Sequence, residues 1–312
     1  MGTHLPERNF LCLAGGGYKG CYQCGVLESL DWNKYDAVFG TSVGALNGLA
    51  VAMDDKQLML ELWGRVKTGY RFHKLPFWNF LAVPFGRRGV ATNLLFKEVE
   101  RILGSIVKPY YVTVVDIDAG ALHYAKIENS KDLVNLGYKV TFFDRSGISE
   151  HVYYLSRELT AKIIVASTTI PLMFSPVEFS GMQLVDGGVM DKSPLSMVAT
   201  LGATKVLLIS CDPDFPESTS EVGNLVEIGK RSIDLLCQEV ALNDERGFVQ
   251  MNRWLASGQL RSKDFRKISF EVLRPDRYFI GDSMSPSNAE IIEGIKMGQA
   301  HVKEYLTVVN PA

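Results

Sequence analysis

Short apolar runs alternate along the chain with longer segments of helical periodicity. The runs predict strands because they are rich in β-branched or aromatic residues and are bounded by glycine, serine or charged residues. The longer segments repeat apolar residues three and four positions apart, which is typical of helices that bury one face. Predicted strands cover 10–13, 37–39, 110–116, 122–127, 139–143, 176–179, 182–185, 205–210 and 268–273. Predicted helices cover 21–30, 43–53, 56–66, 92–103, 156–167, 221–255 and 285–305.

The first of these elements follow one another as strand, glycine loop, helix, strand and helix. This order indicates an α/β fold with a parallel sheet and helical crossovers. With 312 residues, of which 46% are hydrophobic, the chain is long enough to bury a large core. We find no internal repeat, linker or low-complexity tract, and we therefore expect a single domain over 1–312.

The composition argues against several classes of protein. A net charge of -2 gives no general attraction to nucleic acid. No apolar run approaches the length of a membrane span, and residues 1–9 lack the apolar region of a signal peptide. The 5 cysteines have irregular spacing, which indicates reduced thiols and a cytoplasmic protein. Cys21 and Cys24 form a Cys-x-x-Cys, which we interpret as one buried helix face, with a redox pair or half a zinc site as the alternative. No second cluster completes a metal site, so we expect no metal.

The sequence Gly40-Thr41-Ser42-Val43-Gly44 lies between an apolar strand and a helix of small residues. A sharp turn from strand to helix holds the middle side chain outward, and glycine on either side avoids clashes, as in a nucleophile elbow. The N-terminus of the following helix favours negative charge that develops nearby. We therefore predict that Ser42 is an acyl-transfer nucleophile. The alternative is an ordinary strand-to-helix turn capped by serine or threonine.

A second glycine-rich segment, Gly15-Gly16-Gly17-Tyr18-Lys19-Gly20, follows the first strand. It matches Gly-x-Gly-x-x-Gly, but a dinucleotide site also needs an acidic residue after the second strand, where the elbow lies instead. Glycines in series let backbone N–H groups converge, which suits an oxyanion site, and Gly16 and Gly17 are the expected donors. Lys19 supports the loop, meets an anionic headgroup or is simply solvated.

A serine nucleophile needs a base. Of the 5 histidines, only His301 fits the order Ser, Asp, His together with Asp186, and it lies inside a predicted helix rather than in a loop. Asp186 ends a predicted hairpin and is followed by Gly187 and Gly188. A carboxylate in a shielded pocket has a raised pKa and is able to accept the serine proton. An ordinary Asp-Gly turn is the alternative.

Residues 71–88 mix aromatic and basic residues with two prolines. Such a composition suits a membrane interface, where rings lie among headgroups and cations meet lipid phosphate. We therefore expect this segment to make a peripheral membrane contact or to form a lid. The alternative is an irregular segment that packs on its own domain.

Four blocks of sequence carry a resemblance to a known family. They are Gly15–Gly20, Gly40–Gly44, Ala166–Phe174, and Asp186–Gly188 with Pro194 shortly after. In this order and spacing they resemble the patatin-like phospholipase family, with the core motifs inside 10–215. The C-terminal helices and strand of 216–312 include a stretch similar to the closing helix of bacterial members. The resemblance implies a three-layer α/β/α fold with a mostly parallel central sheet.

The resemblance also implies a chemistry. It implies a Ser-Asp dyad, Ser42 and Asp186, that hydrolyses fatty-acyl esters of membrane glycerolipids or phospholipids through an acyl-enzyme, with no cofactor or metal. The other residues carried over are Gly15, Gly16, Gly17, Lys19 and Gly20 in the oxyanion loop, Gly40 and Gly44 in the elbow, and Gly187 and Gly188 after the base. Two alternatives stay open: a catalytically silent or activator-dependent module of the same fold, and a Ser-Asp-His carboxylesterase. A protein activator or a homo-oligomer also stays open.

Overall fold

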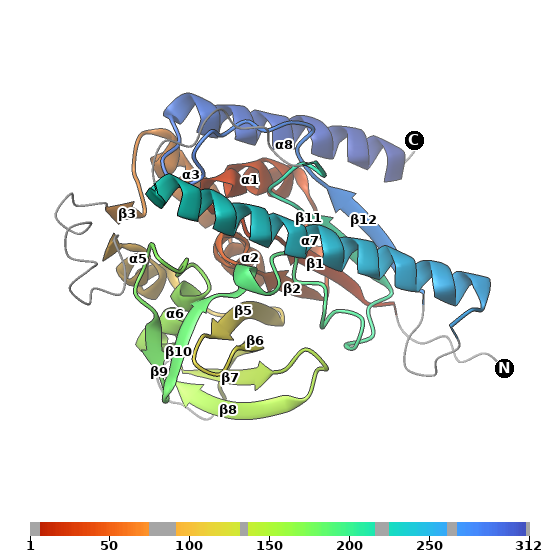
Figure 1. Ribbon diagram of the computed structural model, residues 1–312, viewed down its shortest axis with the longest axis horizontal. Coiled ribbons are helices and arrows are strands. Elements are labelled where there is room, and N and C mark those ends of the chain that lie inside the picture. The colour runs from red at the N-terminus through yellow and green to blue at the C-terminus, as the bar shows by residue number, and fades with distance from the viewer. Residues whose placement is uncertain (1–6, 75–91, 132–136, 216–224, 261–266, 310–312) are drawn as a thin grey trace.

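The computed structural model describes residues 7–74, 92–131, 137–215, 225–260 and 267–309 (Figure 1). Strands of the central sheet are β1 (Asn9–Leu13), β2 (Ala37–Gly40), β5 (Tyr110–Asp116), β6 (Ala121–Asn129), β7 (Tyr138–Phe143), β8 (Ser149–Leu155), β9 (Val177–Phe179), β10 (Met182–Asp186), β11 (Lys205–Ile209) and β12 (Ser269–Leu273). Helices are α1 (Gly20–Ser29), α2 (Val43–Met53), α3 (Lys56–Lys67), α5 (Leu95–Ile102), α6 (Arg157–Ala166), α7 (Leu225–Ser257) and α8 (Asn288–Val309).

A 10-stranded sheet runs through the middle of the molecule (Figure 1). Its order is β12-β11-β1-β2-β5-β6-β7-β8, and β10 pairs with both β5 and β9. The strands from β12 to β5 pair in parallel, as the alternation of strands and helices predicts. From β5 to β8 the sheet continues as antiparallel hairpins.

Side chains of β1 alternate between two apolar cores, one on each face of the sheet. Leu11 and Leu13 pack in the core that also takes buried residues from α1, α2, α3, α6 and α8. Phe10 and Cys12 pack in the other core, with residues of the 195–203 segment and with Phe248 of α7. In Figure 1, α7 crosses in front of the strands, and α8 lies beside α1. The fold class is confirmed: helices lie on both sides of a central sheet in three layers.

The edge of β5 is shared by two strands that arrive from opposite directions. β2 pairs in parallel with the first part of β5, and Gly40 lies opposite Val112. β10 pairs antiparallel with the last part, and Asp186 lies opposite Val114. Two residues of a strand span about 7 Å. The end of β2 and the end of β10 therefore meet, and whatever follows Gly40 lies next to Asp186.

Two local differences from the predicted elements have physical causes. The predicted helix over 92–103 begins only at Leu95, because β4 (Thr92–Asn93) pairs with β3 (His73–Lys74) in a short antiparallel ladder. The strand β8 was not predicted from the sequence. It lies at the edge of the sheet with most of its residues exposed. Its first residues, 149–151, are polar, and only 152–155 carry strand-forming apolar side chains.

Candidate active site

Ser42 lies at the corner between β2 and α2. Its backbone has a φ of 56° and a ψ of -125°, a region that non-glycine residues rarely adopt and that costs about 1–3 kcal/mol. Close packing explains the flanking glycines: a Cβ on Gly40 would lie 2.6 Å from backbone atoms of Ala45, and one on Gly44 would overlap the Leu13 carbonyl. This is the strained strand-to-helix turn that the sequence predicts.

Asp186 is the last residue of β10, and its carboxylate faces the elbow. The Gly188 N–H donates to Asp186 Oδ1 at 2.8 Å, and the Ser42 side chain lies close enough to the carboxylate to lower its pKa. Only 5% of Asp186 is exposed. Burial raises the pKa of Asp186 to about 6, against the lowering effects of Ser42, the Gly188 amide and Lys192. The carboxylate is thus ionised at neutral pH and close to the pH at which it takes up a proton.

The segment after α6 fixes both of these residues through their backbones. The Ser42 N–H donates to Ser167 Oγ at 2.9 Å. The Asp186 N–H donates to the Thr169 carbonyl oxygen at 3.0 Å. The small residues of 166–171 predict such a close approach of backbones near a site, and the structure shows it.

The glycine loop lies directly beside Ser42. The Gly15 N–H donates to the Lys192 carbonyl oxygen at 3.0 Å, so this amide is already used and Gly15 shapes the loop rather than donating to a ligand. Among the described residues, the Gly16 and Gly17 amides have no hydrogen-bond partner. Both glycines line a pocket together with Ser42 and Asp186. The available donors are therefore Gly16 and Gly17. Gly20, at the end of the loop, begins α1 and packs against Val43, while Gly187 and Gly188 form the short turn after Asp186.

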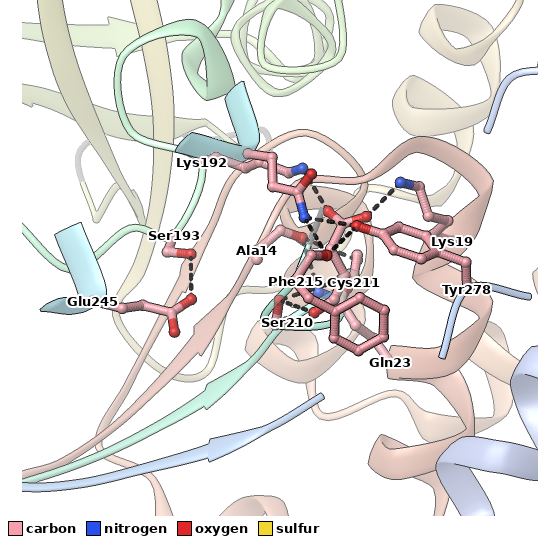
Figure 2. A network of polar contacts seen from close by, with 12 residues as sticks. Ala14, Lys19, Gln23, Lys192, Ser193, Ser210, Cys211, Phe215, Glu245 and Tyr278 are labelled. Atoms are coloured by element: carbon pink, nitrogen blue, oxygen red, sulfur yellow. Dashed lines mark hydrogen bonds and ion pairs between the residues drawn. The ribbon is translucent and has the colours of Figure 1, made fainter. Parts of the chain in front are cut away.

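Lys19 is neither solvated nor free to meet a headgroup alone. Lys192 donates to Asp212 Oδ2 at 2.5 Å, and Lys19 donates to the other carboxylate oxygen (Figure 2). Burial alone would raise the pKa of Asp212, but the two ammonium groups outweigh it and hold that pKa well below its usual range. Lys192 also lines the pocket with Asp186. The cluster therefore ties the glycine loop to the segment after Asp186 and leaves one net positive charge at the back of the site.

A buried carboxyl pair lies behind the same turn. Thr41 Oγ1 donates to the backbone oxygen of Asp191 at 3.0 Å, and the Asp191 side chain accepts from the Tyr124 hydroxyl. The Asp244 carboxyl of α7 lies near that of Asp191, and Asp191 Oδ1 and Asp244 Oδ2 have no hydrogen-bond partner among the described residues. Burial and the mutual repulsion of the two carboxylates raise the pKa of Asp191. Each of the two carboxyls therefore takes up a proton more readily than an exposed aspartate does.

The structure does not bring His301 to Ser42. His301 lies on α8, its Nδ1 is 3.0 Å from the Tyr22 hydroxyl, and its ring packs edge-on against Tyr22. It lines neither of the pockets that contain Ser42. The end of β2 offers no acidic side chain for a ribose, since Asp36 precedes the strand and accepts from the Asn9 N–H.

The Cys-x-x-Cys pair lines neither pocket at Ser42, whereas Phe72 and His73 of the aromatic segment line one of them. Cys21 and Cys24 are buried, free thiols of α1, as the helix-face interpretation predicts. Within the described ranges, no three metal-ligating side chains gather in one place. Of the 71–88 segment, Arg71 donates to the Pro286 carbonyl oxygen at 2.6 Å and Phe72 stacks on Tyr18, while 75–88 lie outside the described residues. No described helix is both long and apolar enough to cross a bilayer.

Comparison with protein families agrees with this geometry. The family model "Patatin-like phospholipase" matches residues 11–199, which is more than half of the chain and includes the glycine loop, the elbow and Asp186. The chain belongs to the patatin-like phospholipase family. One relative of this patatin-like chain is a protein named Lysophospholipase NTE1 from Mycosarcoma maydis, which is 25% identical over 202 residues. That alignment spans 64% of the present chain and 9% of the much longer relative.

Sequence reasoning missed the residues that support the site from behind. These are the buried charged residues Lys192, Asp212 and Asp191. The sequence around each of them has no motif that indicates a functional or buried position. The one available signal was the position of Asp191 and Lys192 directly after Asp186-Gly187-Gly188, a turn that the resemblance had already placed at the site.

Proposed function

We propose that this patatin-like chain is a serine lipid acyl hydrolase in which Ser42 is the nucleophile and Asp186 is the general base. The placement of Ser42 and the buried Asp186 carboxylate in one pocket is the observation that carries the proposal. It gives the serine a proton acceptor without a histidine. The position of Ser42 at the N-terminus of α2 adds a favourable field for an oxyanion.

The reaction follows from this arrangement. Asp186 takes the hydroxyl proton as Ser42 Oγ attacks the ester carbonyl carbon, and the carbonyl oxygen becomes an oxyanion that accepts from the Gly16 and Gly17 N–H groups. Collapse of this intermediate breaks the bond to the alcohol oxygen, and Asp186 returns its proton to that oxygen. Water then attacks the acyl-enzyme by the same route, with Asp186 as its base, and releases the fatty acid.

The substrate class is an acyl ester of a membrane glycerolipid or phospholipid. Family membership supports a lipid ester, and the name of the Mycosarcoma maydis relative points to a lysophospholipid as one member of the class. We propose that the protein acts peripherally at the membrane surface. Contact through 71–88 stays a prediction from composition.

Three matched variants test the assignment of the dyad. Ser42→Ala and Asp186→Asn should each lower hydrolysis of a long-chain ester by a factor of about 10³ or more, because each removes one half of the nucleophile–base unit. His301→Ala should leave the rate unchanged, since its ring contacts Tyr22 and not the site. A fluorophosphonate probe followed by mass spectrometry should label Ser42. Loss of activity in folded His301→Ala together with an active Asp186→Asn would show that the base is histidine.

A further inference from the structure

Two pockets of different chemistry meet at Ser42. The first, which we call the polar pocket, is lined by the glycine loop, Asp186 and Lys192. The second, which we call the apolar pocket, is lined chiefly by hydrophobic side chains from α2, α3 and the segment around Phe174. Ser42 lines both pockets. An ester held at Ser42 therefore has one half in each environment.

The apolar pocket continues away from Ser42 as a groove along α2. A further apolar hollow shares five of its lining residues, Val43, Leu46, Trp63, Phe72 and Leu95. From there it extends between α3 and α5 to a far end lined by Met59, Leu62, Val99 and Ile102. We call these two adjoining hollows together the α2 groove. It begins beside the nucleophile and runs into the space between three helices.

Polar groups in the wall of the α2 groove are bonded to one another. Trp63 Nε1 donates to Asn47 Oδ1 at 2.8 Å, and the Asn47 amide nitrogen donates to Gln23 Oε1 at 2.9 Å. At the far end, Glu98 accepts from Arg65 at 2.6 Å and from Arg101 at 2.7 Å. A polar ligand in the groove would have to displace these bonds, whereas a methylene chain needs none of them.

The position of the base fixes which half of the ester enters the groove. Asp186 lines the polar pocket and does not line the groove. Because Asp186 must return its proton to the departing oxygen, the alcohol leaves from the polar pocket. The acyl chain then extends from Ser42 into the α2 groove. This step rests on the proposed function.

We propose that the α2 groove binds the acyl chain of the substrate, with Leu62 at the far end as a residue that sets the preferred chain length. From Val43 to Ala50 the groove follows about 10 Å of helix α2. An extended chain advances about 1.2 Å per bond, so this stretch covers roughly eight to ten carbons. Each methylene that leaves water for the groove raises kcat/KM by up to about fourfold. The gain should level off beyond that length.

A matched pair of variants on one helix tests the proposal. Leu62→Trp fills the far end, while Leu58→Trp makes the same change four residues earlier, at a half-buried position that lines neither pocket nor groove. The readout is kcat/KM for esters with acyl chains from butyryl to hexadecanoyl. We expect Leu62→Trp to lower the ratio of decanoyl to butyryl hydrolysis by about tenfold or more. Leu58→Trp should keep the wild-type ratio. An unchanged ratio in Leu62→Trp, or an equal fall in Leu58→Trp, would overturn the proposal.

A binding measurement separates this proposal from the proposed function. Calorimetric titration with 1-decanol, a neutral probe, reads occupancy of the groove without turnover. Binding should weaken about tenfold or more in Leu62→Trp and stay the same in Leu58→Trp. If no ester is hydrolysed by the wild type but decanol binding depends on Leu62, the groove stands and the hydrolase proposal fails. If esters are hydrolysed and neither readout depends on Leu62, the groove proposal fails alone.

Discussion

Replacing Asp186 with asparagine separates what this carboxylate costs the fold from what it contributes to the site. Asparagine keeps the size of the side chain and the oxygen that accepts from the Gly188 N–H. Its amide nitrogen takes the place of the oxygen that faces the Ser42 hydroxyl. The substitution therefore removes a buried charge and leaves the packing and the hydrogen-bond positions in place.

The size and sign of the effect follow from the pKa. Burial raises the pKa of Asp186 to about 6 from an ordinary value of 3.8. Well below pH 4 the carboxyl is protonated in both the folded and the unfolded chain, so it has no effect on stability there. As the pH rises from about 4 to 6, the unfolded chain releases this proton and the folded chain retains it, so the wild type loses stability. About two pH units at 1.36 kcal/mol each amount to about 3 kcal/mol.

Urea unfolding measures this difference directly. We expect Asp186→Asn to raise the free energy of unfolding by about 3 kcal/mol at pH 8 and to leave it nearly unchanged at pH 4. For a chain of this length the gain corresponds to a Tm increase of roughly 5 °C. The same variant should be inactive at both pH values, since asparagine accepts no proton from serine.

An exposed carboxylate provides the control. Asp276 lies at the surface beside Arg277, and Asp276→Asn should change the free energy of unfolding by less than about 0.5 kcal/mol at either pH. If Asp186→Asn is no more stable than the wild type at pH 8, the carboxylate is not destabilised by burial. If the gain is as large at pH 4 as at pH 8, its origin is packing and not charge.

Three further predictions concern the base and the groups behind it. The kcat/KM of the wild type should fall about tenfold per pH unit below pH 6 and be level above it, because Asp186 must be ionised to act; a profile that is flat from pH 5 to 8 would rule this out. Asp212→Asn should lower the free energy of unfolding by about 3–5 kcal/mol, because two buried ammonium groups lose their partner; a loss under about 1 kcal/mol in urea titration would contradict the ion-pair account. The wild type should lose stability as the pH rises above about 4, because the unfolded chain releases the Asp191 proton at its ordinary pKa while the folded chain retains that proton up to its raised pKa. Thermal melts should show this fall weakened in Asp244→Asn, and an equal fall in both proteins would refute the account.

The nucleophile elbow could be predicted from the sequence because all of its residues are adjacent in the chain. Residues 37–45 contain the strand, the glycines and the small helix residues that together define the turn, and the structure reproduces each of them. The residues alone left the base undecided between Asp186 and His301. Asp186 lies at the site because β10 pairs with β5, and His301 lies away from it because α8 packs on α1. Neither of these long-range contacts can be predicted from the local sequence. The family resemblance selected Asp186.

The cluster behind the site could not be predicted for a related reason. Lys192 follows the turn after β10, and Asp212 follows β11, so their ion pair forms only when those segments lie side by side. A lysine and an aspartate in loops look the same in sequence whether they are solvated or buried. The strand β8 was missed although 152–155 hold strand-forming residues, because its first residues are polar and exposed at the sheet edge.

The shared edge of β5 also has a consequence for the order in which a newly made chain matures. The elbow and the first part of β5 emerge from the ribosome well before β10, since chains are synthesised from the N-terminus. Until β10 docks, the last part of β5 keeps an unpaired edge towards this side and Ser42 has no carboxylate beside it. A nascent or truncated chain that ends before β10 is thus both prone to aggregate and unable to activate its serine. With the proposed dyad, the serine is activated only when β10 pairs with β5, so hydrolysis of a soluble ester should report the docking of β10 during refolding.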